Sequence, residues 1–425
     1  MTETPRFAEH EGSRTHPIHA ARPEPVPGTP QTERALPLET PGRTLSIYPA
    51  RAGYDLQREL DFLTNRAIEP NVFFTGRFLA PAMPRLEDRQ IRLLMVRDED
   101  ERRSRLRFVM PFSIDRRPAI GLPILRAWAN PFAPNGTPIV DREDAAGTLD
   151  DLFGGLADAQ AGFPGVMVLP QLDLDGPFVR TLRAIALSRG LALAEVQRHS
   201  RAVLESTLDG ETYLRERLSK HRRNELNRQQ RRLEGTGRLT YDVARQPDAV
   251  ARRLEDFLFL EADGWKGRQR TALINDRYRA AFTREAIANL AEIDAVRIHA
   301  LDLDGRMIAG MVVFVMGGTA YTWKTAYDEA QGKDSPGALL MRRLTEWQLE
   351  DANILRTDSC ALPDHPVMDR FWAERATIGT LVVGLTPEND RDVRQVATRY
   401  HLYENTRSIA RRLRDKVRTI ARLQR

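Results

Sequence analysis

The stretch from Tyr321 to Asp328, continued by Ser335-Pro336-Gly337, carries the clearest chemical signal in the sequence. Ser335 suits an N-cap and Pro336 suits the first position of a helix. The first turn of a helix presents unpaired N–H groups and the positive end of the helix dipole, which together bind phosphate or pyrophosphate. The same residues also make an ordinary helix start, so the pattern alone leaves phosphate binding and plain capping both open.

Other chemistries find little support in the composition. The 425 residues include one cysteine, Cys360, so no disulfide can form within the chain, and no CxxC pair or Cys/His cluster indicates a metal site. This cysteine usage predicts a reducing, cytoplasmic compartment. The longest apolar run, Met307 to Met316, is about half the length of a membrane-spanning helix. The start of the chain lacks the pattern of a secretory signal, so we expect a cytoplasmic protein.

Two stretches of the chain, 44–205 and 237–386, show the same order of elements. Each reads strand, strand, strand, helix, strand, helix, strand, at an offset of roughly 200 residues. In the second stretch Asp304-Gly305 gives the strongest hairpin signal of the sequence, and a helix is expected near 364–375. We therefore expect an α/β (α+β layered) fold of two similar domains with mixed central sheets flanked by helices.

Three further segments surround these stretches. Residues 1–43 contain eight prolines and few large apolar groups, which predicts a disordered tail. Residues 206–236 are expected to form a basic linking helix, and 387–425 a basic amphipathic helix. The apolar stripe of this last helix consists of Leu402, Ile409, Leu413, Val417 and Ile420. Basic segments attract phosphates in general, so nucleic acid, anionic lipid, nucleotide cofactors and acidic polymers all remain candidate partners.

Four motifs occur in a characteristic order at compatible spacing. They are Leu260-Glu261 with Trp265-Lys266-Gly267, the hairpin Asp304–Ala309, the strand Trp323–Asp328 and the helix start Ser335-Pro336-Gly337. Over about 215–385 this order resembles the acetyltransferase domain of the GNAT superfamily, in the branch labelled cellulose-biosynthesis-type or FemAB-like. The first stretch, with Asn130–Gly136, fits the tandem layout of Fem-type proteins. The sequence lacks the Gln/Arg-x-x-Gly-x-Gly/Ala pyrophosphate loop, so Ser335-Pro336-Gly337 would take its place.

The resemblance implies direct acyl transfer, in which an acceptor amine or hydroxyl attacks the thioester carbonyl of acyl-CoA, for example acetyl-CoA. Such a reaction needs a base, oxyanion donors and a proton for the leaving thiolate. By analogy, a backbone N–H of the strand ending near Tyr327 holds the oxyanion, and Tyr327 protonates the thiolate. His365 is the first choice for the base because the pKa of histidine lies nearest neutrality. Asp358 would orient His365 or bind the acceptor.

The same reading assigns binding roles and requires no metal. The cofactor-binding residues would be Lys324, Ser335, Gly337, Ala338 and Arg342, and the acceptor-binding residues Trp265, Lys266, Trp323 and Asp328. Each has a plainer alternative: tryptophans are more often core aromatics, and a histidine before proline can be a solvated loop residue. A hydrolase triad built on Ser359 lacks the G-x-S-x-G elbow.

We therefore expect an N- or O-acyltransferase acting on a small molecule or a cell-envelope or exopolysaccharide precursor. Aminoacyl transfer from tRNA, as in Fem-type proteins, is the alternative within enzymes, and the basic helices would then carry tRNA phosphates. A non-catalytic GNAT-like binding protein is the alternative of a different class. Residues 405–425 suit an anionic membrane surface at the inner face of the membrane, and they suit equally well packing on the protein's own domains.

Overall fold

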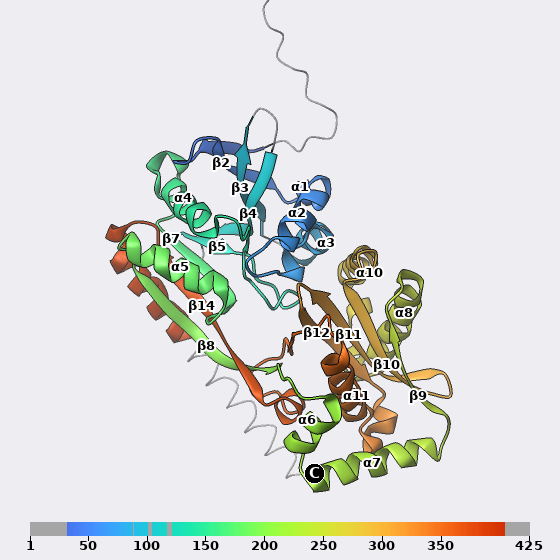
Figure 1. The fold of residues 1–425 in the computed structure, drawn as a ribbon. Coiled ribbons are helices and arrows are strands. Elements are labelled where there is room, and N and C mark those ends of the chain that lie inside the picture. The colour runs from blue at the N-terminus through green and yellow to red at the C-terminus, as the bar shows by residue number, and fades with distance from the viewer. Residues whose placement is uncertain (1–31, 88, 101–103, 117–120, 404–425) are drawn as a thin grey trace, which may run out of the picture.

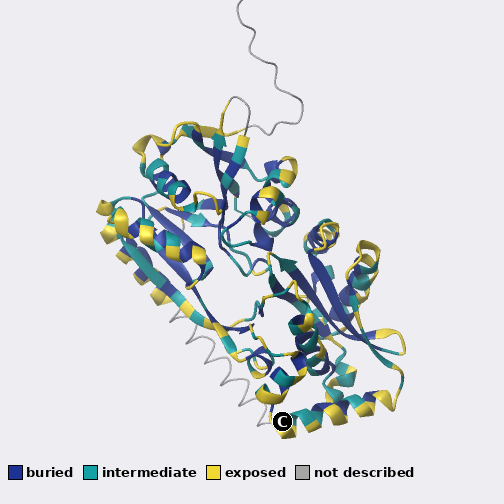
Figure 2. Ribbon diagram, viewed as in Figure 1, coloured by how far each residue is buried: buried dark blue, intermediate teal, exposed yellow. Residues whose placement is uncertain are grey.

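The computed structural model describes residues 32–87, 89–100, 104–116 and 121–403 (Figure 1). The described strands form one mixed sheet in the order β1-β2-β3-β4-β5-β7-β14-β8-β13-β12-β11-β10-β9, with β6 beside β4. Helices cover both faces of this sheet (Figure 1). The inner strands are mostly buried, whereas the two edge strands are mostly exposed or half-buried (Figure 2). The mixed α/β class expected from the sequence is confirmed.

The first unit precedes residue 205. Its strands are β1 (Arg34–Pro37), β2 (Arg43–Pro49), β3 (Arg92–Glu99), β4 (Ser104–Asp115), β5 (Ile124–Ala127), β6 (Ile139–Val140), β7 (Val166–Asp173) and β8 (Leu193–Leu204). Its α-helices are α1 (Ala52–Asp55), α2 (Gln57–Asn65), α3 (Gly76–Leu86), α4 (Ala145–Ala157) and α5 (Pro177–Ser188).

The remainder of the chain begins with two basic helices. The α-helices are α6 (Gly210–Arg217), α7 (Lys220–Glu234), α8 (Pro247–Asp263), α9 (Trp265–Arg268), α10 (Arg277–Ala291), α11 (Pro336–Glu350) and α12 (Met368–Phe371). The strands are β9 (Leu239–Ala244), β10 (Val296–Leu303), β11 (Arg306–Met316), β12 (Thr319–Tyr327), β13 (Arg356–Asp358) and β14 (Glu374–Gly384), and a 3₁₀ helix, η4 (Glu329–Asp334), precedes α11.

Local sequence signals explain several of these boundaries. Asp304 and Gly305 both have positive φ (52° and 80°) and join β10 to β11, as the hairpin signal predicts. The Asp276 side chain accepts two N–H groups at the start of α10, which is the usual role of an N-cap aspartate. Pro247 occupies the first turn of α8, where its missing N–H costs nothing.

The last strand returns from the second unit to the first. β14 pairs antiparallel with β7 on one side and β8 on the other, and the end of β8 pairs with β13. The two units therefore share one sheet, with β14 lying between strands of the first unit. A division of the chain at fixed residue numbers stays a prediction.

The largest apolar core also spans both units. It combines side chains of α1–α3 with those of α8, α10 and β10–β12. Phe78 of α3 meets Phe282 of α10 edge to face, with ring centroids 5.3 Å apart, and Arg77 donates to the Asn289 carbonyl (2.8 Å). This packing fixes α1–α3 of the first unit against α8, α10 and one face of β10–β12 in the second.

Some local expectations are corrected. The helix expected near 364–375 is a single turn, α12. The basic helix expected over 206–236 is divided into α6 and α7, because Leu218 is extended and Ser219 caps α7 by accepting the Arg222 N–H. Part of the tail predicted to be disordered is the strand β1, which pairs with β2. Ordered structure therefore begins before Thr44.

The predicted C-terminal helix is described only over 390–403. Val393 and Val396 of this segment pack with Val168 and Val382 of the sheet, so this part of the helix covers the first unit. The stripe residues beyond Leu402, and the segment 405–425 that was expected to meet a membrane, lie outside the described residues.

Candidate functional site

Strands β12 and β13 separate after a short parallel pairing. The last paired residues are Tyr321 and Asp358, and β12 continues beyond them to Tyr327. The Thr322 Oγ1 donates to the Ser359 carbonyl (2.7 Å) at the start of the separation. Backbone N–H groups alternate between the two edges of a strand. Those of 322–327 that face away from β11 therefore have no strand partner in the described structure.

A β-bulge lies in β12 where this separation begins. Val312 of β11 pairs with Lys324, whereas Val313 pairs with Thr322, so Trp323 is the extra residue. A bulge bends a strand and re-aims its side chains. The Lys324 Nζ lies 5.4 Å from the centroid of the Trp323 ring, which places both side chains on the face that α8 and α10 cover.

Helix α11 begins just beyond the end of β12. Ser335 has a left-handed backbone (φ 48°) and its side chain does not cap the helix, so the N-cap expected from the sequence is not formed. Pro336 has no N–H, the Ala338 N–H donates to the Ser335 carbonyl, and the Gly337 N–H has no acceptor among the described residues. A Cβ on Gly337 would lie 3.6 Å from the Tyr327 ring. The first turn thus offers an unpaired N–H beside Tyr327, at the positive end of the helix dipole.

Helix α7 lies beside this helix start. The buried Gln229 donates from Nε2 to the Ser335 Oγ (3.2 Å), and its Oε1 has no partner in the described structure. Arg232 pairs with Asp334. The helix carries six Lys or Arg against two Glu, so the first turn of α11 lies next to a strongly positive surface. Three of these cations are exposed and have no ion pair with any described residue: Lys220, Arg228 and Arg231.

Lys324 lies on the opposite face of the sheet from α11. Its Nζ is 4.2 Å from the centroid of the Phe132 ring, whereas α11 packs in the core that contains Leu339 and Leu344. Burial, helped by the neighbouring Lys266 ammonium, lowers the pKa of Lys324 to about 8. The sheet therefore separates Lys324 from the first turn of α11. The prediction that both bind the same cofactor is wrong for Lys324.

Asp358 is half of a buried ion pair between the two units. Its Oδ2 lies 3.3 Å from the Arg201 Nη1, and its Oδ1 accepts the Cys360 N–H (2.7 Å). Arg201 also donates to the Gln171 Oε1 (2.9 Å). Burial and the Asp358 charge raise the pKa of the Cys360 thiol, so this thiol is neutral and poorly nucleophilic.

His365 lies half-buried in the loop after β13. Its Nδ1 accepts the N–H groups of Val367 (3.4 Å) and Met368 (3.2 Å) at the start of α12, and burial lowers its pKa. A neutral ring that accepts at Nδ1 carries its proton on Nε2. No hydrogen bond links His365 to Asp358 among the described residues, so the two side chains expected to act together have separate partners.

Two of the residues predicted to bind the acceptor hold the site together. Trp323 is buried, and its Nε1 donates to the Phe132 carbonyl (2.8 Å). The Lys266 Nζ donates to the Glu261 Oε1 and the Thr325 carbonyl, both at 2.8 Å. Trp323 therefore serves as a core aromatic, and Lys266 ties α9 to β12.

The remaining predicted residues lie around the rim of the site. Trp265 is 43% exposed. Asp328 accepts the Ala330 N–H (2.8 Å) and so caps η4. Arg342 donates to the Asn227 Oδ1 (2.9 Å), which fastens α11 to α7, and burial lowers its pKa.

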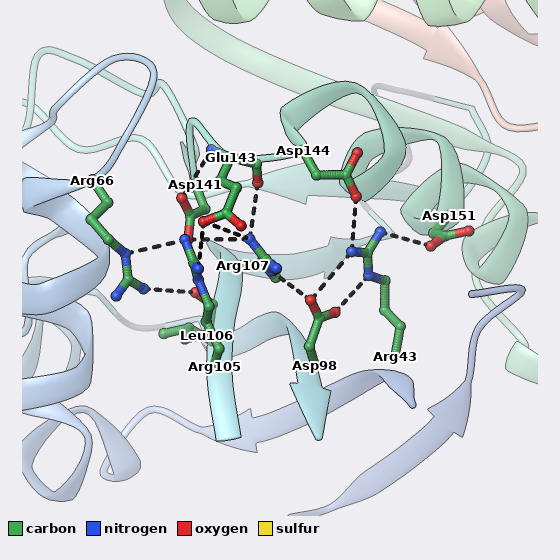
Figure 3. Close-up of polar contacts among 10 residues, drawn as sticks. All are labelled: Arg43, Arg66, Asp98, Arg105, Leu106, Arg107, Asp141, Glu143, Asp144 and Asp151. Carbon is green, nitrogen blue, oxygen red and sulfur yellow. Dashed lines mark hydrogen bonds and ion pairs between the residues drawn. The ribbon is translucent and has the colours of Figure 1, made fainter. Parts of the chain in front are cut away.

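The corresponding helix start in the first unit, that of α4, is occupied by the chain's own charges (Figure 3). The Asp144 carboxylate covers the first turn, since a Cβ on Gly147 would lie 2.4 Å from its Oδ1. Arg43 is 4% exposed and pairs with Asp98, Asp144 and Asp151. An incoming phosphate would meet carboxylates here, in contrast to the open first turn of α11. The other charged members of this network are Arg66, Arg105, Arg107, Asp141 and Glu143.

Four side chains around the site escaped the sequence reading: Phe132, Arg201, Gln229 and Arg279. They come from a loop, β8, α7 and α10, so only the folded chain brings them to β12 and α11. Of the four, Phe132 lies in Asn130–Gly136, the segment whose sequence fits the tandem layout.

Within the described ranges, no group of three or more His, Cys, Asp or Glu side chains is arranged to hold a metal ion. In the same part of the chain, no helix is both long enough and apolar enough to cross a membrane.

Solved structures with a similar chain course include FemX, with 9% identity over 77% of this chain and 95% of that chain and a TM-score of 0.49. The C-terminal domain of a putative lysylphosphatidylglycerol synthetase from Agrobacterium fabrum gives 13% identity, coverages of 78% and 92%, and a TM-score of 0.48. A tandem GNAT protein from the clavulanic acid biosynthesis pathway gives 12% identity over 81% of this chain and 99% of that chain, with a TM-score of 0.39. At these identities and TM-scores the likenesses bear on neither activity nor substrate.

No curated protein matches the sequence. The sequence model of one family, described as an acetyltransferase (GNAT) domain, matches residues 220–359. This match contains α7, the bulged strand β12, the open first turn of α11 and the point where β13 separates from β12. Residues 220–359 are therefore similar in sequence to acetyltransferase (GNAT) domains.

Proposed function

We propose that this protein transfers an acyl group from acyl-CoA to an amine or hydroxyl of a small molecule or of a cell-envelope or exopolysaccharide precursor. It would then act as a member of the cellulose-biosynthesis-type, FemAB-like branch. The observation that carries the proposal is the unpaired Gly337 N–H at the start of α11, beside the splayed edge of β12. A helix start of this kind binds a pyrophosphate, and the splayed edge offers backbone N–H donors to a carbonyl.

The cations of α7 support the same assignment. Arg228 and Arg231 are exposed on the helix whose Gln229 contacts Ser335. They add positive charge beside the first turn of α11, where the phosphates of CoA would lie. Lys324 and Arg342 drop out of the cofactor site, because one lies across the sheet and the other is bound to α7.

In the reaction, the acceptor nitrogen or oxygen forms a bond to the thioester carbonyl carbon, and the carbon–sulfur bond then breaks. Backbone N–H groups on the free edge of β12 would stabilise the oxyanion. Tyr327 would supply the proton that the thiolate takes up, since its ring lies against Gly337. His365 can take up the acceptor proton only at Nδ1, and this requires it to release the N–H groups of Val367 and Met368.

The proposal is tested by calorimetric titration with acetyl-CoA and longer acyl-CoAs. We expect saturable binding that is lost in Gly337→Glu, where the new carboxylate occupies the phosphate position. The matched control is Gly332→Glu, which adds the same charge in η4 at a place where a Cβ meets nothing within 4 Å. Binding that survives in Gly337→Glu, or that is lost equally in both variants, would contradict this cofactor site.

Failure of the wild-type protein to bind any acyl-CoA would overturn the acyl-CoA proposal and favour aminoacyl-tRNA as the donor. That alternative is measured directly by tRNA binding at increasing salt, because binding through phosphates weakens steeply with salt concentration. Once an acceptor is found, Tyr327→Phe and His365→Gln are expected to lower kcat. An unchanged kcat would remove the proposed role from the residue concerned.

A further inference from the structure

Two cations of residues 220–359 flank one aromatic ring of the first unit. The Lys324 Nζ lies 4.2 Å, and the Arg279 Cζ 5.8 Å, from the centroid of the Phe132 ring. The ring is held in place because the Phe132 carbonyl accepts the Trp323 Nε1–H. Lys324 comes from β12 and Arg279 from α10, so the fold of both units is needed to bring the two cations to this ring.

Neither cation has a carboxylate partner among the described residues. Glu261, the carboxylate whose charge acts on Lys324, is already satisfied by the Lys266 Nζ and the Leu273 N–H, both at 2.8 Å. The Cys360 thiol adds no negative charge, because burial keeps it protonated. The neighbourhood of Phe132 therefore has an excess of positive charge, and a half-buried ammonium without a counterion is costly.

These cations lie on the opposite face of the sheet from the first turn of α11. The first turn of α11, where acyl-CoA is proposed to bind, is reached from one face of β12, and Lys324 and Arg279 lie on the other. The splayed edge of β12 lies between them. An acceptor that approaches a thioester in this gap from the side of α10 passes both cations.

We propose that the acceptor carries an anionic group, a carboxylate or a phosphate, which Lys324 and Arg279 bind beside Phe132. This inference rests on the proposed function, since it names the chemical class of the acceptor for that reaction. The anion would neutralise the excess charge, and the guanidinium of Arg279 would give it hydrogen bonds of defined geometry.

The test uses calorimetry of the full chain with succinate and inorganic phosphate as probes and acetamide as a neutral control. We expect either or both anions to bind and acetamide not to bind. Lys324→Gln and Arg279→Gln should each weaken anion binding about tenfold or more. Arg277→Gln is the matched control, because Arg277 lies on the same helix and also stacks on a ring, that of Tyr278, but not near Phe132.

The variant Gly337→Glu separates this inference from the proposed function and from a phosphate bound at α11. If Gly337→Glu abolishes anion binding while Lys324→Gln does not, the anion lies at α11 and the inference is wrong. If acyl-CoA binds but neither anion does, the inference fails and the proposed function stands. If anions bind through Lys324 and Arg279 but no acyl-CoA binds, the anion site stands and the acyl-CoA-dependent function falls.

Discussion

The indole Nε1 of Trp323 donates a 2.8 Å hydrogen bond to the main-chain carbonyl of Phe132. The donor is the extra residue of the β12 bulge, and the acceptor belongs to the loop that reaches β12 from the first unit. This bond fixes the ring of Phe132 beside Lys324 and closes one side of the splayed strand. The geometry of the site thus depends on contacts between the units as well as on residues 220–359 themselves.

Replacing Trp323 by Phe is expected to lower the free energy of unfolding by about 1–3 kcal/mol, because a buried carbonyl loses its donor while most of the apolar contact remains. Chemical denaturation measures this change. Trp265→Phe is the control, since Trp265 is 43% exposed. Equal stability of the two variants would show that the bond to Phe132 contributes nothing to the fold.

The buried pair of Arg201 and Asp358 gives a second prediction. Asp358→Ala and Arg201→Met are each expected to cost about 3–5 kcal/mol, because each leaves one buried charge unpaired. The double variant should be clearly more stable than the sum of the single losses implies. A double-mutant cycle by denaturation checks this. Asp358→Ala with normal stability and no activity would instead identify Asp358 as a catalytic group.

Elements encoded by local patterns could be predicted well from the sequence. Asp304-Gly305, the strands on either side of it and the Pro336 helix start all rest on neighbouring residues, and the structure forms them close to the expected positions. The Ser335 cap failed because the residue takes a left-handed backbone and its Oγ accepts from Gln229, a partner more than a hundred residues away.

Long-range pairing could not be predicted in this way. Nothing within β14 indicates that it lies between β7 and β8, because its hydrophobic pattern suits any buried strand equally well. The same limit applies to the site. Tyr327 and Gly337 are near in sequence and lie close together in the fold. Phe132 and Arg279 reach Lys324 only through the packing of α3 against α10 and of the first-unit loop against β12.

The lowered pKa of Lys324 predicts that the stability of the fold changes with pH in the alkaline range. The pKa of Lys324 is about 8 in the folded protein and 10.5 in its ordinary state, so between these values the unfolded chain binds more protons and stability rises with pH. The gain is about 3 kcal/mol across this interval, at 1.36 kcal/mol per pKa unit. Lys324→Met should remove this gain, which denaturation in buffers without phosphate or carboxylate would measure.

The matched control for this titration is Lys333→Met, because Lys333 is exposed in η4. Both variants keep all the other groups that titrate above neutral pH, so those groups change the free energy of unfolding equally in the two. If the wild type and Lys324→Met show parallel curves of stability against pH, Lys324 is not held in the poorly compensated environment described above.

The burial of His299 predicts that the stability of the fold depends on pH in the acidic range. His299 is fully buried on β10, its Nδ1 lies 2.7 Å from the Tyr241 hydroxyl, and its Nε2 has no partner in the described structure. Burial, and secondarily the Arg297 charge, lower its pKa from 6.5 to about 3. Below about pH 6.5 the His299 imidazole binds a proton in the unfolded chain but stays neutral in the folded protein. The free energy of unfolding therefore falls as the pH falls towards 3.

The variant His299→Phe keeps most of the volume and removes this proton linkage. Between about pH 7.5 and pH 4.5 the wild type should lose about 2–3 kcal/mol more stability than the variant, as measured by urea denaturation. His221→Gln serves as the control, since His221 is exposed on α7 and should behave like the wild type. Equal acid sensitivity of His299→Phe and the wild type would mean that the fold accommodates a charged His299, and the buried ring would then have to reach water by a local opening of β9 and β10.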